Sequence, residues 1–182
     1  GCPLGLSSGV FGPIGLTAGD FARHSRRRAL NGQARSGQAV TAGIRAVHDG
    51  RRLEIVIEPA TGDQAPLGLA SVRSALIEAI RSAKAEVHCI LIRGAAPAVL
   101  RGPDLPQPEH RKAPVMADLT HAVETSPVPV AILLEGPVSG CGAELALAAR
   151  LKLAAPTATL AFPAARLGLV QGAGAVQRLT RL

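Results

Sequence analysis

The stretch that decides the fold is GPVSGCGAELAL, residues 136–147, where an apolar run gives way to glycines and then to helix-forming residues. The preceding run VPVAILL, residues 128–134, is almost uniformly apolar, as a parallel strand covered on both faces is. Glycines let a backbone approach a ligand closely, and the first N–H groups of the following helix lack partners inside it. The pattern therefore predicts a strand, a glycine turn and a helix whose N-terminus can hold a carbonyl oxygen that becomes negative during a reaction.

Glu144 falls in the first turn of this expected helix, beside the place where such a carbonyl would lie. It is the only acidic residue after Glu135, and a carboxylate among Ala and Leu needs a reason because burying it unpaired is costly. Two interpretations stay open from the pattern alone: an acid/base group, or a residue favoured near a helix N-terminus by the helix dipole. Glycine-rich turns also occur in dinucleotide folds, but those carry an acid about 20 residues further on, and none follows here.

Outward from this stretch, hydrophobic periodicity predicts strands alternating with helices. This order is typical of an α/β fold with right-handed crossovers, in which ligands bind at the carboxyl ends of the strands. The expected strands are 53–58, 87–93, 128–134, 151–154 and 159–162, and the expected helices are 69–84, 116–124 and one beginning at 143–149.

The N-terminal segment differs in composition from the rest of the chain. The net charge is +7, but residues 1–52 hold eight arginines against two aspartates, whereas residues 53–182 hold twelve basic and eleven acidic side chains. We therefore expect residues 1–45 to be a poorly ordered or leader-like basic segment, such as a transit peptide or the end of an upstream domain. Residues 46–182 are expected to form one domain.

Composition also limits the function. The 182 residues include three widely spaced cysteines, Cys2, Cys89 and Cys141, which predict neither a metal site nor a disulfide framework and favour a reducing cytoplasm. The expected domain lacks the basic face and stacking aromatics of a nucleic-acid-binding protein. The longest apolar run is too short to span a bilayer, so no membrane span is expected.

Residues 53–182 resemble the crotonase superfamily, the enoyl-CoA hydratases and isomerases, and most of all the N-terminal hydratase domain of multifunctional fatty-acid β-oxidation enzymes. The resemblance implies a crotonase-like ββα spiral core. The family continues beyond the point where this chain stops, so a C-terminally truncated version is expected. The matching blocks are APLG at 65–68, ILIRG at 90–94, LRGPDL at 100–105, PVAILLEGPVSGCGAELALA at 129–148, and FP, LGL, GAG and QRL between 162 and 179.

The resemblance also implies what the site does. It implies acyl-CoA as the substrate, a coenzyme A thioester, with no other cofactor, and a homotrimer or hexamer if the full family C-terminus is present. Glu144 matches a catalytic glutamate, Gly172 a water-positioning glycine, and Gly140 and Cys141 the oxyanion hole that binds the thioester carbonyl. The remaining acyl-CoA-binding positions fall on Ala65, Leu67, Leu100 and Gly102.

Two positions depart from the family pattern. The first oxyanion N–H falls on Pro103, which has no N–H to give, and the second catalytic glutamate falls on Ala164, which cannot transfer a proton. One hypothesis is therefore an enoyl-CoA hydratase/isomerase-type lyase or isomerase of fatty-acid β-oxidation with a partly degraded site. The alternative is a non-catalytic acyl-CoA-binding or scaffold domain derived from the same family.

Overall fold

The computed structural model describes residues 39–60, 65–83, 85–97, 99–102 and 111–181. Its main sheet has six strands in the order β1-β2-β3-β4-β5-β7, and a second sheet pairs β6 with β8. The strands β1 to β3 run antiparallel as a meander, and β3, β4, β5 and β7 run parallel. The strands are β1 Ala39–Thr41, β2 Ile44–Asp49, β3 Arg52–Ile57, β4 Cys89–Gly94, β5 Val130–Leu134, β6 Pro137–Ser139, β7 Leu151–Ala154 and β8 Thr159–Ala161.

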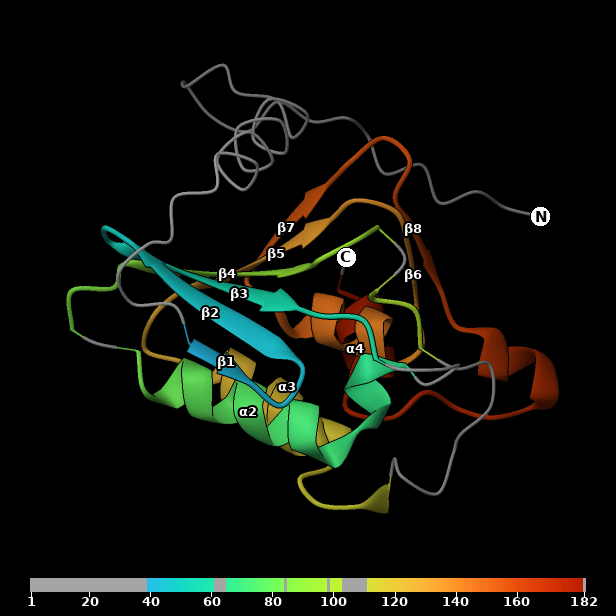
Figure 1. Cartoon of the computed structure of the whole chain (residues 1–182). Helices are drawn as coiled ribbons and strands as arrows, with labels where there is room; N and C mark the ends of the chain where they lie inside the picture. The colour runs from blue at the N-terminus through green and yellow to red at the C-terminus, as the bar shows by residue number, and fades with distance from the viewer. Residues whose placement is uncertain (1–38, 61–64, 84, 98, 103–110, 182) are drawn as a thin grey trace.

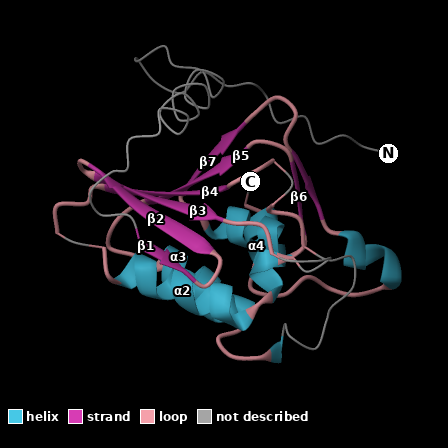
Figure 2. Ribbon diagram, viewed as in Figure 1, coloured by secondary structure: helices cyan, strands magenta, loops and turns pink. Residues whose placement is uncertain are grey.

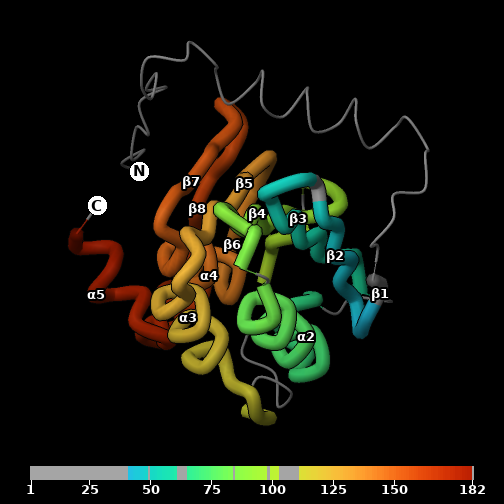
Figure 3. Tube along the Cα trace, turned by 90° about the vertical axis from the view of Figure 1, so that its left-hand side faces the viewer, coloured from blue at the N-terminus to red at the C-terminus, as the bar shows by residue number. Residues whose placement is uncertain are grey.

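Helices cover one face of the main sheet (Figures 1 and 2). The end-on view in Figure 3 shows α2 and α3 side by side, with α4 next to α3. Apolar side chains from this helical layer and from the sheet form one core cluster, in which Leu76, Ile92 and Ile132 are fully buried. The helical segments are η1 Pro66–Gly68, α2 Ala70–Arg81, α3 Met116–Glu124, α4 Cys141–Ala148, η3 Pro163–Leu167 and α5 Ala175–Leu179.

The parallel part of the sheet agrees with the periodicity of the sequence. Every residue of β5 is buried, as predicted for a strand covered on both faces. The helix α3 spans the predicted residues, and the N–H of Val115 donates to the Asp118 carboxylate at 2.7 Å, which satisfies one of the groups at its N-terminus. Within the described residues, no helix is long and apolar enough to cross a membrane.

The N-terminal boundary of the fold lies earlier than predicted. Residues 39–45, assigned from composition to the leader-like segment, form β1 and the start of β2, while residues 1–38 lie outside the described residues. Ala42 and Gly43 both have positive φ, as tight hairpin turns of the primed types require. The strand β2 of this hairpin pairs with β3. The order of residues 39–45 therefore depends on pairing with β3, which the composition of the segment does not indicate.

Candidate active site

The N-terminus of α4 is the centre of the candidate site. The helix starts at Cys141, two residues before the predicted start, because Gly140 has a φ of 53° and turns the chain directly from β6 into the helix. The N–H of Glu144 donates to the Gly140 carbonyl at 3.0 Å, which closes the first turn. All eight residues of α4 are buried, and Glu144 is only 8% exposed.

The loop that follows β4 packs against this turn by backbone contacts. The N–H of Gly102 donates to the Ser139 carbonyl at 2.8 Å, and the N–H of Ser139 donates to the Leu100 carbonyl at 3.4 Å. A Cβ on Gly102 would lie 2.9 Å from the Cys141 nitrogen. The structure therefore brings Gly102, Gly140 and Cys141 together, and the oxyanion role of Gly140 and Cys141 stays a prediction. Pro103, the predicted site of the missing N–H, lies outside the described residues.

Gly172 reaches the same site from the C-terminal side. Its N–H donates to Oε1 of Glu144 at 3.2 Å, so the predicted water-positioning glycine contacts the predicted catalytic carboxylate directly. The next residue, Ala173, has a φ of 48°, and its carbonyl accepts hydrogen bonds from the Thr120 hydroxyl at 3.3 Å and from the Arg178 guanidinium. The Glu144–Gly172 contact is thus supported by α3 and α5.

Burial governs the protonation of the two ionisable groups on α4. Desolvation raises the pKa of Glu144 above its ordinary value, while the hydrogen bond from Gly172 and the positive charge of Arg178 act in the opposite direction. Desolvation, with the nearby Glu144 charge, raises the pKa of the Cys141 thiol to about 11. Glu144 is therefore a carboxylate held closer to neutrality than an exposed one, as an acid/base group needs.

The side chain of Arg178 forms a two-pronged ion pair with α3. Its Nε and Nη2 lie 2.6 and 2.7 Å from the two carboxylate oxygens of Glu124. This pairing lowers the pKa of Glu124 and raises that of Arg178. Neither Arg178 nor Thr120 is predicted from the sequence as a support of the site. The QRL block that contains Arg178 was the only signal for either of them.

The predicted acyl-CoA-binding residues are mostly buried. Ala65, Leu67 and Leu100 are 8%, 1% and 3% exposed, and Leu67 and Leu100 belong to the core cluster. The side chains of Leu67 and Leu100 therefore contribute to the hydrophobic core. The N–H of Gly68 donates to the Ala65 carbonyl at 2.9 Å and closes η1.

Ala164 lies apart from the buried part of the site. It belongs to η3, none of whose residues is buried, and η3 projects at the right-hand edge of Figure 1, away from α4. Its carbonyl accepts a hydrogen bond from the N–H of Leu169 at 3.2 Å. The structure thus brings together Glu144, Gly140, Cys141, Gly102 and Gly172, but it supplies no acid/base side chain at Ala164.

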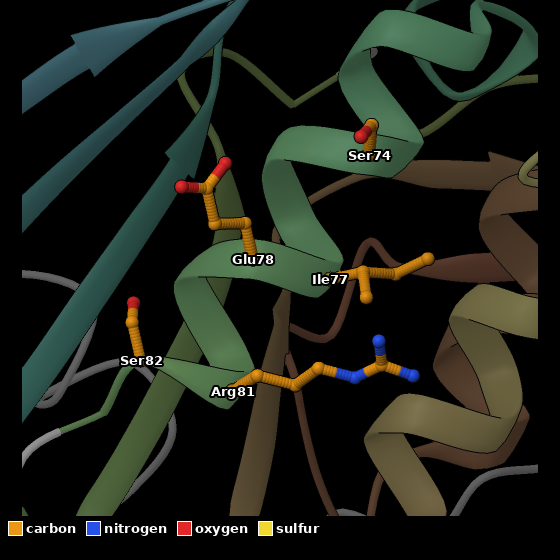
Figure 4. A pocket seen from close by; sticks show the side chains of 5 residues that line it. All are labelled: Ser74, Ile77, Glu78, Arg81 and Ser82. Atoms are coloured by element: carbon orange, nitrogen blue, oxygen red, sulfur yellow. The ribbon is translucent and has the colours of Figure 1, made fainter.

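A surface hollow on α2 does not make a second candidate site. It measures about 430 Å³ and is open to solvent. Figure 4 shows that its polar groups diverge: Glu78 and Ser82 point toward the strands, whereas Arg81 points to the opposite side with Ile77. Binding sites need convergent polar groups. Among the described residues, no cluster of His, Cys, Asp and Glu could hold a metal ion.

Comparisons with known proteins point to one family. A family model described as enoyl-CoA hydratase/isomerase matches residues 72–182. An enoyl-CoA isomerase/hydratase of Mycosarcoma maydis is 37% identical over 101 residues, which are 51% of this chain and 37% of that protein. A glyoxysomal fatty acid beta-oxidation multifunctional protein of Cucumis sativus is 30% identical over 145 residues, which are 74% of this chain and 20% of that protein. The chain therefore spans well under half the length of either relative.

Solved structures agree with the sequence relatives. An enoyl-CoA hydratase subunit from Geobacillus kaustophilus superimposes with a TM-score of 0.66 at 25% identity, covering 79% of this chain and 58% of that one. An enoyl-CoA hydratase from Polaromonas sp. superimposes with a TM-score of 0.65 at 25% identity, covering 76% of this chain and 58% of that one. These likenesses cover more than three quarters of the chain rather than a single motif.

Proposed function

This chain belongs to the enoyl-CoA hydratase/isomerase family and has the crotonase fold, and on that premise we propose that it binds a coenzyme A thioester at the N-terminus of α4. Glu144 moves a proton at the acyl carbons of this ligand. The metabolic setting we propose is fatty-acid β-oxidation, which the name of the Cucumis sativus relative supports.

One observation carries the proposal: a buried carboxylate with a raised pKa lies one turn from a helix N-terminus and accepts the N–H of Gly172. Backbone N–H groups at a helix N-terminus stabilise negative charge on a ligand oxygen. The N–H of Cys141 is the donor we assign to the thioester oxygen. A carboxylate beside that oxygen can then take a proton from carbon, because the enolate that forms is stabilised next to it.

A proton shift fits this site better than hydration does. For a 3-enoyl thioester, Glu144 would remove a proton from C2 and return it to C4, giving the 2-enoyl thioester with the double bond moved by one position. One carboxylate can perform both transfers. Hydration needs one group to deprotonate water and another to protonate the α-carbon, and the second position holds Ala164. We therefore propose isomerisation as the main activity and hydration as a weak one.

The second candidate is a non-catalytic acyl-CoA-binding or scaffold domain of the same family. It is favoured by Ala164 and by the sequence position of Pro103, which together remove two groups that family members use. The arrangement of Gly140, Gly172 and Glu144 favours the catalytic candidate, because a pure scaffold has no need for a buried carboxylate with a raised pKa.

The proposal includes an assembly and a compartment. Large apolar side chains are exposed after residue 150, and they support a homo-oligomer, a trimer or a hexamer. These side chains are Leu151, Leu167, Leu169, Val170, Val176 and Leu179. A reducing compartment, proposed as the cytoplasm, is supported by the free thiols of Cys89 and Cys141.

The assay follows crotonyl-CoA hydration by loss of enone absorbance, and isomerisation of a 3-enoyl-CoA by its gain, in the parent protein, Glu144→Ala and Ala164→Glu. We expect isomerisation in the parent, its loss in Glu144→Ala, and little gain in hydration in Ala164→Glu, because η3 holds position 164 away from α4. Glu78→Ala, which removes an exposed carboxylate on α2, is the matched control. If the parent binds both thioesters but converts neither, the catalytic candidate is wrong for these substrates. Failure to bind any thioester would overturn both candidates.

A further inference from the structure

Arg73 on α2 is a fully buried cation, with 0% of its surface exposed. A guanidinium stays protonated in proteins, and a buried charge is tolerated only where its donors find partners. Position 73 lies on the apolar face of α2, one turn from Leu69 and one turn from Ile77. An arginine at a core-facing position is unusual, and the groups that its guanidinium binds indicate its role.

The guanidinium binds two segments of the chain at once. Its Nη1 donates to the carbonyls of Leu67 and Gly68 at 2.8 and 2.7 Å. Its Nε donates to the carbonyl of Pro114 at 2.6 Å, and its Nη2 donates to that of Lys112 at 2.8 Å. Arg73 therefore links η1, which holds the predicted acyl-CoA-binding residue Leu67, to the segment that leads directly into α3.

This link extends to the catalytic carboxylate. The helix α3 carries Thr120 and Glu124, which hold the carbonyl of Ala173 and the side chain of Arg178. The adjacent N–H of Gly172 contacts Glu144. A chain of contacts therefore runs from Arg73 through the segment before α3 and α3 itself to Gly172. Arg73 can therefore set the position of η1 relative to α3, which in turn holds the segment that contacts Glu144.

The charge of Arg73 also reaches the N-terminus of α4. Its positive charge counteracts part of the desolvation that raises the pKa of the Cys141 thiol. The same field favours negative charge near the N–H of Cys141, where the thioester oxygen is expected. Family members use two N–H donors at this oxygen, and one of the two positions is Pro103 in this chain.

We propose that Arg73 is a positioning residue of the acyl-CoA site, which fastens η1 to the segment before α3. This inference rests on the proposed function, because it assumes that the ligand is a coenzyme A thioester. A purely structural arginine would support the stability of the fold without a separate effect on ligand affinity.

The test measures the affinity for crotonyl-CoA by titration calorimetry in a Glu144→Gln background, which prevents turnover. Arg73→Met removes the charge and the donors at similar side-chain length, and Arg73→Lys keeps the charge with fewer donors. The matched control is Arg45→Met, which removes a half-buried arginine of β2 that is paired with Glu58. Thermal melting and hydrogen exchange at residues 66–68 and 112–114 are recorded for each variant.

We expect Arg73→Met to bind at least tenfold more weakly, Arg73→Lys to lie between it and the parent, and Arg45→Met to stay within twofold of the parent. Faster exchange at both segments should accompany the loss of affinity. Unchanged affinity in a cooperatively melting Arg73→Met overturns the inference while leaving the proposed function intact. If Arg73→Met does not fold, Arg73→Lys decides, and parental affinity there overturns the inference. A parent that binds no thioester overturns the proposed function and this inference with it.

Discussion

Two glycine-bearing segments meet at Glu144, one leading into α4 and one contacting its carboxylate, and they are held in place by different forces. In the first glycine segment, residues 136–142, a Cβ on Gly142 would lie 1.8 Å from the Leu100 carbonyl oxygen, and one on Gly136 would lie 3.0 Å from that of Pro97. In the second glycine segment, residues 168–174, a Cβ on Gly168 would meet nothing within 4 Å, and one on Gly172 would lie 3.8 Å from Glu144 Oε1.

The first glycine segment is held by packing, and the second is held by hydrogen bonds. The first glycine segment is fixed because two backbones touch and leave no room for a side chain. The second glycine segment has room at Gly168 and Gly172, although a Cβ on Gly174 would lie 2.7 Å from Nη1 of Arg178. It is held by hydrogen bonds from Thr120 and Arg178 to Ala173 and from Gly172 to Glu144. Changes in the first should therefore act on folding, and changes in the second should act on the chemistry of Glu144.

The largest effect is expected from adding one methyl group to each segment. Gly142→Ala must displace the Leu100 backbone, so we expect a loss of about 3 kcal/mol in the free energy of unfolding. Gly168→Ala has free space and suffers only from its positive φ of 73°, for which about 1 kcal/mol is expected. Denaturant melts of both variants measure the difference. Equal losses would mean that the two segments are packed alike.

Glu144→Gln should lower turnover by about 10²–10⁴ and raise stability at neutral pH. Burial raises the folded-state pKa of Glu144, so above the ordinary carboxyl pKa the unfolded chain releases this proton more readily than the folded one. Stability therefore falls as pH rises through that window. The gain in melting temperature from Glu144→Gln should be present at neutral pH and vanish below the ordinary carboxyl pKa. A gain that persists in acid would assign the effect to packing instead.

Arg178→Met removes the guanidinium that donates to the Ala173 carbonyl in the second glycine segment. The positive charge of Arg178 lowers the pKa of Glu144, so its removal should raise that pKa further and move the rising limb of the pH–rate profile to higher pH. The freed Ala173 carbonyl should also misplace Gly172, and turnover at neutral pH should fall by roughly tenfold. Arg166→Met, in the exposed η3, is the control. If turnover falls but the pH profile does not move, the charge of Arg178 does not influence the pKa of Glu144.

The smallest effect concerns the reactivity of the thiol in the first glycine segment. With a pKa of about 11, Cys141 is a thiolate in only about one molecule in a thousand at pH 8. Iodoacetamide should therefore leave Cys141 unmodified in the folded protein and alkylate it in denaturant, as followed by mass spectrometry of peptides. Equal labelling in both states would show that this segment opens readily.

Periodicity in the sequence was sufficient for the elements that carry their own pattern. The apolar repeat of α2, the limits of α3 and the buried run of β5 could all be predicted, because each buries a regular face. The strand β6 and the hairpin β1-β2 could not, since three-residue strands and polar edge strands depend on their pairing partners. The residues that bind to distant carbonyls, above all Arg73, could not be placed either.

The sequence predicted the backbone of the candidate site, but it did not predict the side chains that hold this backbone in place. The glycine turn and the spacing to Glu144 indicated a helix N-terminus with a carboxylate one turn in, and the structure has both. Thr120 and Arg178 act on Ala173 across the gap between α3 and the second glycine segment. Such contacts have no characteristic spacing along the chain.

The bridge between the Arg101 loop and Ser139 has a consequence for the order of folding. The hydroxyl of Ser139 donates to the Gly102 carbonyl across 37 residues of sequence, and the two segments run parallel. Pairing over such a separation is slow compared with the formation of local helices, because a long loop must close first. Helical structure in α2 and α3 should therefore recover early in refolding, and the ability to hold a thioester should return only when long-range pairings such as this one form.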